Sequence, residues 1–284
     1  MKATVIAATL GLGAIFWVAP ATATSLTPIT LFDGTKNTAP DRQGWLTVLG
    51  GATQTVGAGG TTLNTTKGNS IQAGYSTKTP LLLDRNVGYT LGFNVRLLSE
   101  AHSNLNRAGF SVLVLGNDQR GIELGFWTNS IWAQNDGAAK PPRFTRGEST
   151  AFNSAASSMR YDLSVLGNGY QLFANRNYQT PILTGLLRNY SPEGLVYTQK
   201  NFLFFGDNTT SARGAFKLDR VDLLKAALAQ SAAKSVSASV VSASVTDAAT
   251  PVPEPSVILG SGVAIAVGAA SSRKARLMQK KQRA

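Results

Sequence analysis

The sequence predicts an all-β fold, an antiparallel β-sandwich, over residues 25–224. In "GYTLGFNVRLLSE", aromatic and aliphatic side chains occupy every second position from 89 to 97, which is typical of a strand with one buried face. Similar short segments recur along the chain without helical patterns between them, which favours a sandwich or barrel. The composition agrees, because 28 glycines and only 15% charged residues favour strands and turns.

Further strands are predicted in order along the chain. They are the segments 110–115, 122–127, 130–135, 160–166, 170–175, 201–205 and 215–223. Residues that tolerate tight or left-handed backbone separate them, namely Gly116-Asn117-Asp118, Thr128-Asn129, Gly167-Asn168-Gly169 and Gly206-Asp207-Asn208. No repeat of propeller-blade length is visible, so we expect a single sandwich.

Length, cysteine content and charge exclude several classes of protein. A chain of 284 residues is long enough to bury a substantial core. It has no cysteine, which excludes a disulfide framework, a cysteine zinc site and a cysteine nucleophile. Its net charge is +12, but six of the 27 Lys and Arg residues lie in the last twelve positions and the rest are dispersed. No basic stripe interleaved with aromatics remains, so no nucleic-acid partner is expected.

The first 23 residues have the pattern of a secretory signal peptide. Lys2 precedes an apolar stretch, and small residues follow it directly. We predict cleavage by signal peptidase after Ala23, with cleavage after Ala21 as the alternative. An uncleaved anchor helix is the other interpretation, but the apolar span is short for one.

Residues 225–251 are rich in Ala and Ser and are predicted to form a stalk. The stretch "SVSASVVSASV" presents no apolar face that could pack as a helix. A flexible coil of this length reaches roughly 25 to 30 Å. The alternative is a helix over 221–234 that covers the domain.

The last segment, 252–284, combines three features in a fixed order. The motif Pro253-Glu254-Pro255 leads into an uncharged Gly- and Ala-rich span over 257–272, and a basic cluster follows. The span is predicted to be a short apolar helix, below the roughly 20 residues of a relaxed transmembrane helix. Because basic residues stay on the cytoplasmic side, the β-rich domain is expected outside, after transient insertion in the inner membrane.

This order resembles the PEP-CTERM sorting signal of Gram-negative bacteria. The resemblance implies that an exosortase, a membrane transpeptidase-like enzyme, recognises residues 253–255, removes the tail and transfers the protein to the cell surface or to exopolysaccharide. The long terminus after the span departs from the usual pattern and leaves the cytoplasmic limit of the span open. An ordinary tail anchor after a proline-rich turn is the alternative.

The β-rich domain carries a second resemblance. The segments "LFDGT", "GYTLGFNVRLLSE", "AGFSVLVLGND", "GIELGFWTNSIWAQ", "RYDLSVLGNGYQLFAN" and "FLFFGDNTTS" resemble a concanavalin-A-like lectin/glucanase jelly roll of the LamG-like kind. More narrowly, residues 30–224 are similar to the choice-of-anchor Y domain of bacterial surface proteins. The resemblance implies a fold and a surface location, and it implies no activity.

A hairpin in "GIELGFWTNSIWAQ" supplies the candidate binding site. With Thr128-Asn129 as a two-residue turn, Trp127 pairs with Ser130 and Gly125 pairs with Trp132. In the same register Glu123 pairs with Gln134. The face turned away from the core is expected to carry Trp127, Trp132, Glu123 and Gln134.

This face has the chemistry of a carbohydrate-binding site. An indole above a glycine, beside an amide and a carboxylate, suits stacking on a sugar ring and hydrogen bonding to its hydroxyl groups. The alternative is structural: Trp132 fills the gap left by Gly125 or packs beneath the loop 136–149.

Catalysis is not expected. Glycoside hydrolysis requires two facing carboxylates, and "GIELGFW" contains Glu123 alone. The single histidine, His102, has no G-x-S-x-G context and is predicted to be a hydrogen-bonding loop residue beside Glu100 and Asn104.

No cofactor is expected either. Asp207, Asn208 and carbonyls near Asp118 offer oxygen ligands for calcium, but turn formation explains these residues more economically. The sequence therefore predicts an exported, non-catalytic surface or matrix protein associated with exopolysaccharide. A lectin-like carbohydrate-binding module is the alternative, and a glycan hydrolase is a weaker one.

Overall fold

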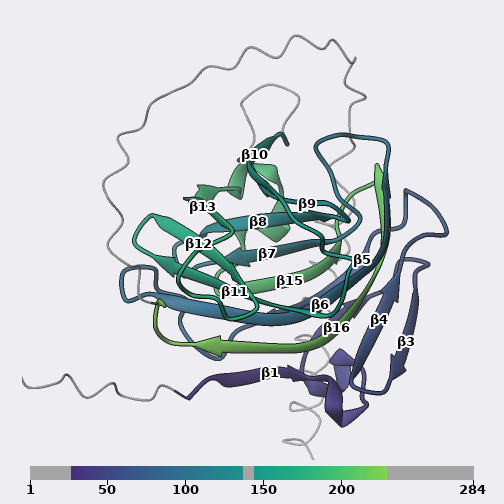
Figure 1. The fold of residues 1–284 in the computed structure, drawn as a ribbon, viewed down its shortest axis with the longest axis horizontal. Coiled ribbons are helices and arrows are strands. Elements are labelled where there is room, and N and C mark those ends of the chain that lie inside the picture. The colour runs from purple at the N-terminus through teal and green to yellow at the C-terminus, as the bar shows by residue number, and fades with distance from the viewer. Residues whose placement is uncertain (1–26, 137–143, 229–284) are drawn as a thin grey trace, which may run out of the picture.

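Alternating side chains place one face of each main strand in a core shared by two antiparallel sheets (Figure 1). The computed structural model describes residues 27–136 and 144–228. In β6 (Tyr89–His102), Leu91 and Phe93 are fully buried whereas Arg96 is exposed. The predicted all-β sandwich is therefore confirmed.

The first sheet is built around its two longest strands. Its members are β1 (Ile29–Asp33), β3 (Thr53–Gly57), β4 (Gly60–Asn64), β6, β11 (Met159–Leu166), β12 (Gly169–Ala174), β13 (Leu183–Leu186) and β16 (Ala212–Leu224). They have the order β13-β12-β11-β6-β16-β4-β3, and β1 pairs with β16 beside this path.

The second sheet carries the predicted hairpin. Its members are β2 (Leu46–Val48), β5 (Ala73–Lys78), β7 (Ser111–Leu115), β8 (Arg120–Trp127), β9 (Ser130–Gln134), β10 (Arg146–Ala151), β14 (Arg188–Asn189) and β15 (Phe202–Asp207). They have the order β10-β9-β8-β7-β15-β5-β2, and β14 pairs with β8.

Four 3-10 helices complete the described residues. They are η1 (Gly34–Lys36), η2 (Pro40–Gln43), η3 (Ser191–Glu193) and η4 (Leu195–Thr198). Within residues 27–136 and 144–228, no helix is both long enough and apolar enough to cross a bilayer.

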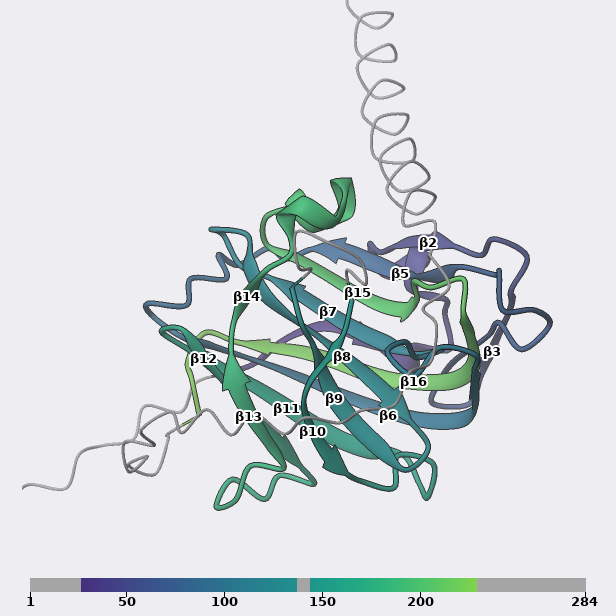
Figure 2. The ribbon, with the colours of Figure 1, turned by 90° about the horizontal axis from the view of Figure 1, so that it is seen from above.

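The outer face of the second sheet is covered by the segment 188–201. Figure 2 shows β14 lying along β8, with the 3-10 helices following it. Val112 and Val114 of β7 face the main core, whereas Leu113 and Leu115 belong to a second apolar cluster with Tyr190 and Tyr197 of this segment. This cover explains why β7 is buried on both faces.

The two ends of the described chain lie at the same end of the sandwich. β1 is antiparallel to β16, and Ile29 is opposite Leu223. The far end of β16 pairs with the last residue of β6, where Ala212 is opposite His102. β6 therefore runs from the end where the chain enters and leaves to the opposite end.

The predicted strands are confirmed, with their ends moved by a few residues. Two turn or loop predictions are wrong. His102 is the last residue of β6 and not a loop residue, because β16 continues the ladder to Ala212. Gly206 and Asp207 end β15 and do not form a turn, because both pair with β5.

The alternative of a helix over 221–234 is wrong at its start, since residues 221–224 are the end of β16. The predicted signal peptide 1–23, the stalk beyond residue 228 and the sorting signal 252–284 lie outside the described residues.

Candidate functional site

The β8–β9 hairpin has the predicted register. Trp127 is opposite Ser130 and Gly125 is opposite Trp132. The two-residue turn fixes this pairing, because a slip of one residue would exchange the core and outer faces.

The ladder stops one pair short of Glu123 and Gln134. The hydroxyl of Tyr190 lies between the two backbones: it accepts the Glu123 N–H at 3.2 Å and donates to the Gln134 carbonyl. The predicted direct pairing of Glu123 with Gln134 is therefore wrong, because a tyrosine hydroxyl occupies that position. Beyond this point β8 changes partner, and Gly121 pairs with Arg188 of β14.

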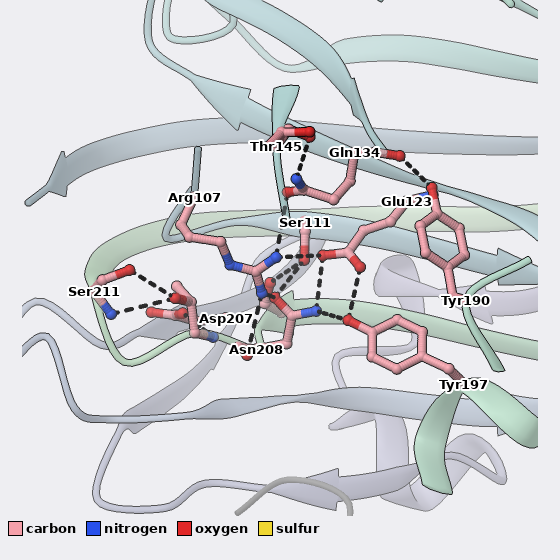
Figure 3. A network of polar contacts seen from close by, with 12 residues as sticks. Arg107, Ser111, Glu123, Gln134, Thr145, Tyr190, Tyr197, Asp207, Asn208 and Ser211 are labelled. Carbon is pink, nitrogen blue, oxygen red and sulfur yellow. Dashed lines mark hydrogen bonds and ion pairs between the residues drawn. The ribbon is translucent and has the colours of Figure 1, made fainter. Parts of the chain in front are cut away.

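The Glu123 carboxylate is the centre of a buried polar network (Figure 3). It accepts hydrogen bonds from Tyr197 Oη and Asn208 Nδ2, both at 2.8 Å, and lies 3.7 Å from Arg107. Burial raises the pKa of Tyr197 well above its usual value, so its hydroxyl remains a proton donor at neutral pH. The Glu123 side chain is only 2% exposed, so the surrounding protein groups satisfy it.

Gln134 belongs to the same network through Arg107 (Figure 3). Its Oε1 accepts from Arg107 at 3.2 Å, and its Nε2 donates to the Thr145 carbonyl at 2.6 Å. The Phe144 ring lies 4.4 Å from the Arg107 guanidinium. Glu123 and Gln134 therefore hold the outer face of the sheet to the segments that cover it.

Asp207 is buried beside this network. It accepts hydrogen bonds from the Thr65 hydroxyl at 2.7 Å and from the Thr209 N–H at 3.2 Å. Burial raises the pKa of the Asp207 carboxyl well above its ordinary value, although the Thr65 hydrogen bond opposes this. The Thr65 hydroxyl also lies 3.1 Å from the Gly214 carbonyl. The Thr65 hydroxyl has one proton to donate, so it can serve only one of these two acceptors at a time.

The oxygen ligands considered for calcium do not come together. Gly206, next to Asp207, pairs with Ser111 at the start of β7, whereas Asp118 follows the end of β7 and contacts Arg85 at 2.7 Å. Among the residues that the structure describes, no group of three or more His, Asp or Glu side chains could hold a metal ion.

Trp132 lies over Gly125, as predicted. A Cβ on Gly125 would be only 2.6 Å from the Trp132 ring, so glycine is required there. Trp127 packs against Trp132 at 4.7 Å in an edge-to-face arrangement, and the Arg146 guanidinium lies 4.5 Å from the Trp132 ring. The Trp132 side chain has no exposed surface.

Trp127 is the partly exposed indole of the pair. The His102 ring stacks on it at 3.8 Å with an interplanar angle of 2°, and the Arg146 guanidinium lies 4.5 Å from it. Its Nε1 donates to the Arg107 carbonyl at 2.9 Å. We call His102, Trp127, Trp132 and Arg146 the aromatic–arginine cluster.

His102 is held in the cluster by Glu100. Its Nδ1 lies 3.0 Å from both carboxylate oxygens, so the predicted contact with Glu100 is confirmed. Burial raises the pKa of the Glu100 carboxyl, and the contact with His102 opposes this rise.

The structure thus divides the four residues predicted to share one face into two groups. Trp127 and Trp132 form the cluster near the hairpin turn, whereas Glu123 and Gln134 form the buried network. Arg146 reaches the cluster from β10 and was not predicted from the sequence. Tyr190 and Tyr197 were not predicted either, because no local pattern marks their contacts.

Comparisons with known proteins find structural likeness alone. No protein-family model matches the chain, and no curated protein matches it by sequence. Solved structures with a similar shape include a carbohydrate esterase of the Shiga toxin-encoding bacteriophage phi24B, at a TM-score of 0.49 and 11% identity, covering 70% of this chain and 99% of that one.

Of two further similar structures, one is named as a carbohydrate recognition domain and the other holds a bound carbohydrate. The potassium-bound Emp46p carbohydrate recognition domain has a TM-score of 0.45 and 12% identity, covering 70% of this chain and 97% of that one. The exoplasmic/lumenal domain of VIP36, bound to Ca²⁺ and Man3GlcNAc, has a TM-score of 0.42 and 9% identity, covering 72% and 90%. At these values the likeness assigns neither a ligand nor an activity to this chain.

Proposed function

We propose that the sandwich is a non-catalytic carbohydrate-binding domain whose contact surface is formed by the partly exposed members of the aromatic–arginine cluster, Trp127, His102 and Arg146. The observation that carries this proposal is the partly exposed Trp127 indole, held in place by His102, Trp132 and Arg146. The part of this indole that His102 and Arg146 leave exposed offers an apolar surface to a sugar, without the loss of side-chain entropy that ordering a mobile ring would require. Trp132 supports Trp127 from below.

The proposal of no catalysis is supported by the environment of Glu123. Its carboxylate is buried and accepts hydrogen bonds from Tyr197 and Asn208, so a substrate would have to displace both.

The antiparallel two-sheet architecture is consistent with the proposed concanavalin-A-like jelly roll.

Trp127→Ala is expected to weaken polysaccharide binding about tenfold, because it removes the stacking surface. Binding of the full-length protein is measured by affinity electrophoresis in gels that contain single polysaccharides. Tyr178→Ala is the control, since Tyr178 is an exposed aromatic, 37% accessible, in the connection between β12 and β13.

Thermal melts establish that both variants are folded. Equal binding by the wild type and by Trp127→Ala, with the variant folded, would refute the proposed contact surface.

We also propose that this domain works outside the cytoplasm. The support is the order of the sequence features: a signal peptide cleaved after Ala23, a stalk, and Pro253-Glu254-Pro255 before an apolar span and a basic tail. In this proposal an exosortase processes the tail, and the sandwich is the choice-of-anchor type of domain delivered to the envelope or to exopolysaccharide.

Mass spectrometry of the protein from its native host tests the export proposal. A mature C-terminus near residues 253–255 is the expected result. A protein that retains both Met1 and Ala284 inside the cell would contradict it.

A further inference from the structure

Arg146 is a partly buried cation without a carboxylate partner among the described residues. Its guanidinium lies 4.5 Å from the rings of Trp127 and Trp132 and donates to Ser130 Oγ at 3.1 Å. Burial lowers the pKa of this group, which nevertheless stays charged at neutral pH because an arginine begins so far above it. The two indole rings attract the guanidinium through cation–π interactions, but they do not supply a negative charge.

The nearby carboxylates of the surrounding strands each contact a side chain other than Arg146. Glu123 is paired with Arg107, and Glu100 contacts His102. Glu148, on the same strand as Arg146, is paired with Arg188. None of these three carboxylates is therefore paired with Arg146.

Two arginines of the sandwich that have carboxylate partners show the contrast. Arg160 contacts both Asp162 and Asp222 at 2.8 Å, and its side chain is 16% exposed. Arg107, at 4% exposure, lies beside Glu123. Arg146 differs from these two arginines in having no carboxylate partner among the described residues, so its partly exposed guanidinium is available to an anionic group from outside the chain.

We propose that the aromatic–arginine cluster recognises an acidic polysaccharide, with a sugar ring on Trp127 and its anionic group on Arg146. This inference rests on the proposed carbohydrate-binding function and adds the class of ligand. A guanidinium binds a carboxylate or a sulfate through two parallel hydrogen bonds between opposite charges, whereas a neutral sugar supplies no counter-charge.

The test compares charged polymers with neutral counterparts of the same backbone. Polygalacturonate is compared with its carboxyl-reduced form, and dextran sulfate with dextran, by affinity electrophoresis of the full-length protein. The wild type is expected to bind the acidic polymers about tenfold more tightly, and Arg146→Gln is expected to remove that preference. Raising the salt concentration should reduce wild-type binding to the acidic polymers.

Two further variants control for net charge and for folding. Arg120→Gln removes one positive charge at an exposed position and is expected to leave the preference unchanged. Arg146→Lys keeps the charge but not the planar fork, so it should retain part of the preference for the acidic polymers. Because a variant that still binds must be folded, Arg146→Lys also controls for misfolding caused by replacing Arg146.

The outcomes separate the two proposals. Equal binding of acidic and neutral polymers by the wild type would overturn the acidic ligand and leave carbohydrate binding intact. A preference that survives Arg146→Gln would also overturn the role of Arg146. Binding to none of the four polymers would count against both the ligand class and the carbohydrate-binding function, whereas binding that is lost with Trp127→Ala and with Arg146→Gln would support both.

Discussion

Glu123→Gln is expected to lower the free energy of unfolding by about 3–5 kcal/mol, the range found when one partner of a buried ion pair is removed. The Arg107 side chain, only 4% exposed, loses its negative partner. Gln also offers one acceptor oxygen where Tyr197 and Asn208 each donate to a separate oxygen of Glu123. Equilibrium unfolding in urea, followed by tryptophan fluorescence, measures the change.

Asp118→Asn is the matched control for this loss. Asp118 pairs with Arg85, but the two side chains are 37% and 22% exposed, so removing the charge should cost less than about 1 kcal/mol. A Glu123→Gln variant as stable as Asp118→Asn would contradict the structural role of Glu123. The carboxylate would then be available for chemistry, and the hydrolase alternative would have to be reconsidered.

Tyr190→Phe is expected to destabilise the domain by about 2–4 kcal/mol. Its hydroxyl bridges the Glu123 N–H and the Gln134 carbonyl, and its removal leaves two buried backbone groups without that bridge. Each unsatisfied buried group costs about 1–3 kcal/mol. Hydrogen exchange should locate the effect, with faster exchange of the amides in β8 around residue 123.

Tyr89→Phe provides the control, because the same single oxygen is removed from another buried tyrosine. The Tyr89 hydroxyl has no hydrogen-bond partner among the described residues. Its removal should change stability by less than about 1 kcal/mol and could increase it, since an unsatisfied polar atom leaves the core. Equal losses in the two variants would show that the Tyr190 hydroxyl does not act as a bridge.

Local pattern was sufficient to predict the central strands. β6 alternates clearly, and the two-residue turn between β8 and β9 set the register that places Trp132 over Gly125. The strands β1 to β5 were missed because all five are short, and β3 to β5 are also rich in Thr and Gly. Thr53–Gly57, for example, is mostly exposed and has no alternating apolar face.

The candidate site was predictable only where its residues are neighbours in the hairpin. Tyr190 is 67 residues away from Glu123 in the chain, and a single hydroxyl inserted into a ladder leaves no periodic signal. Arg146 reaches Trp127 and Trp132 from β10, whose pairing with β9 is shifted in register between Arg146 and Ser149. Simple alternation along the strand therefore does not predict which face Arg146 occupies. The division of the predicted face into a buried network and a surface cluster therefore depended on tertiary contacts.

The course of β6 has a consequence for how the domain would be displayed. This strand of 14 residues spans about 45 Å at the usual rise for a β-strand. Ile29 and Leu223 lie at one end of the sandwich, whereas His102, which stacks on Trp127, lies at the opposite end. If the domain is attached to the cell envelope through either terminus, Trp127 and Arg146 therefore lie at the end farthest from the point of attachment, where they face the polysaccharide outside the cell.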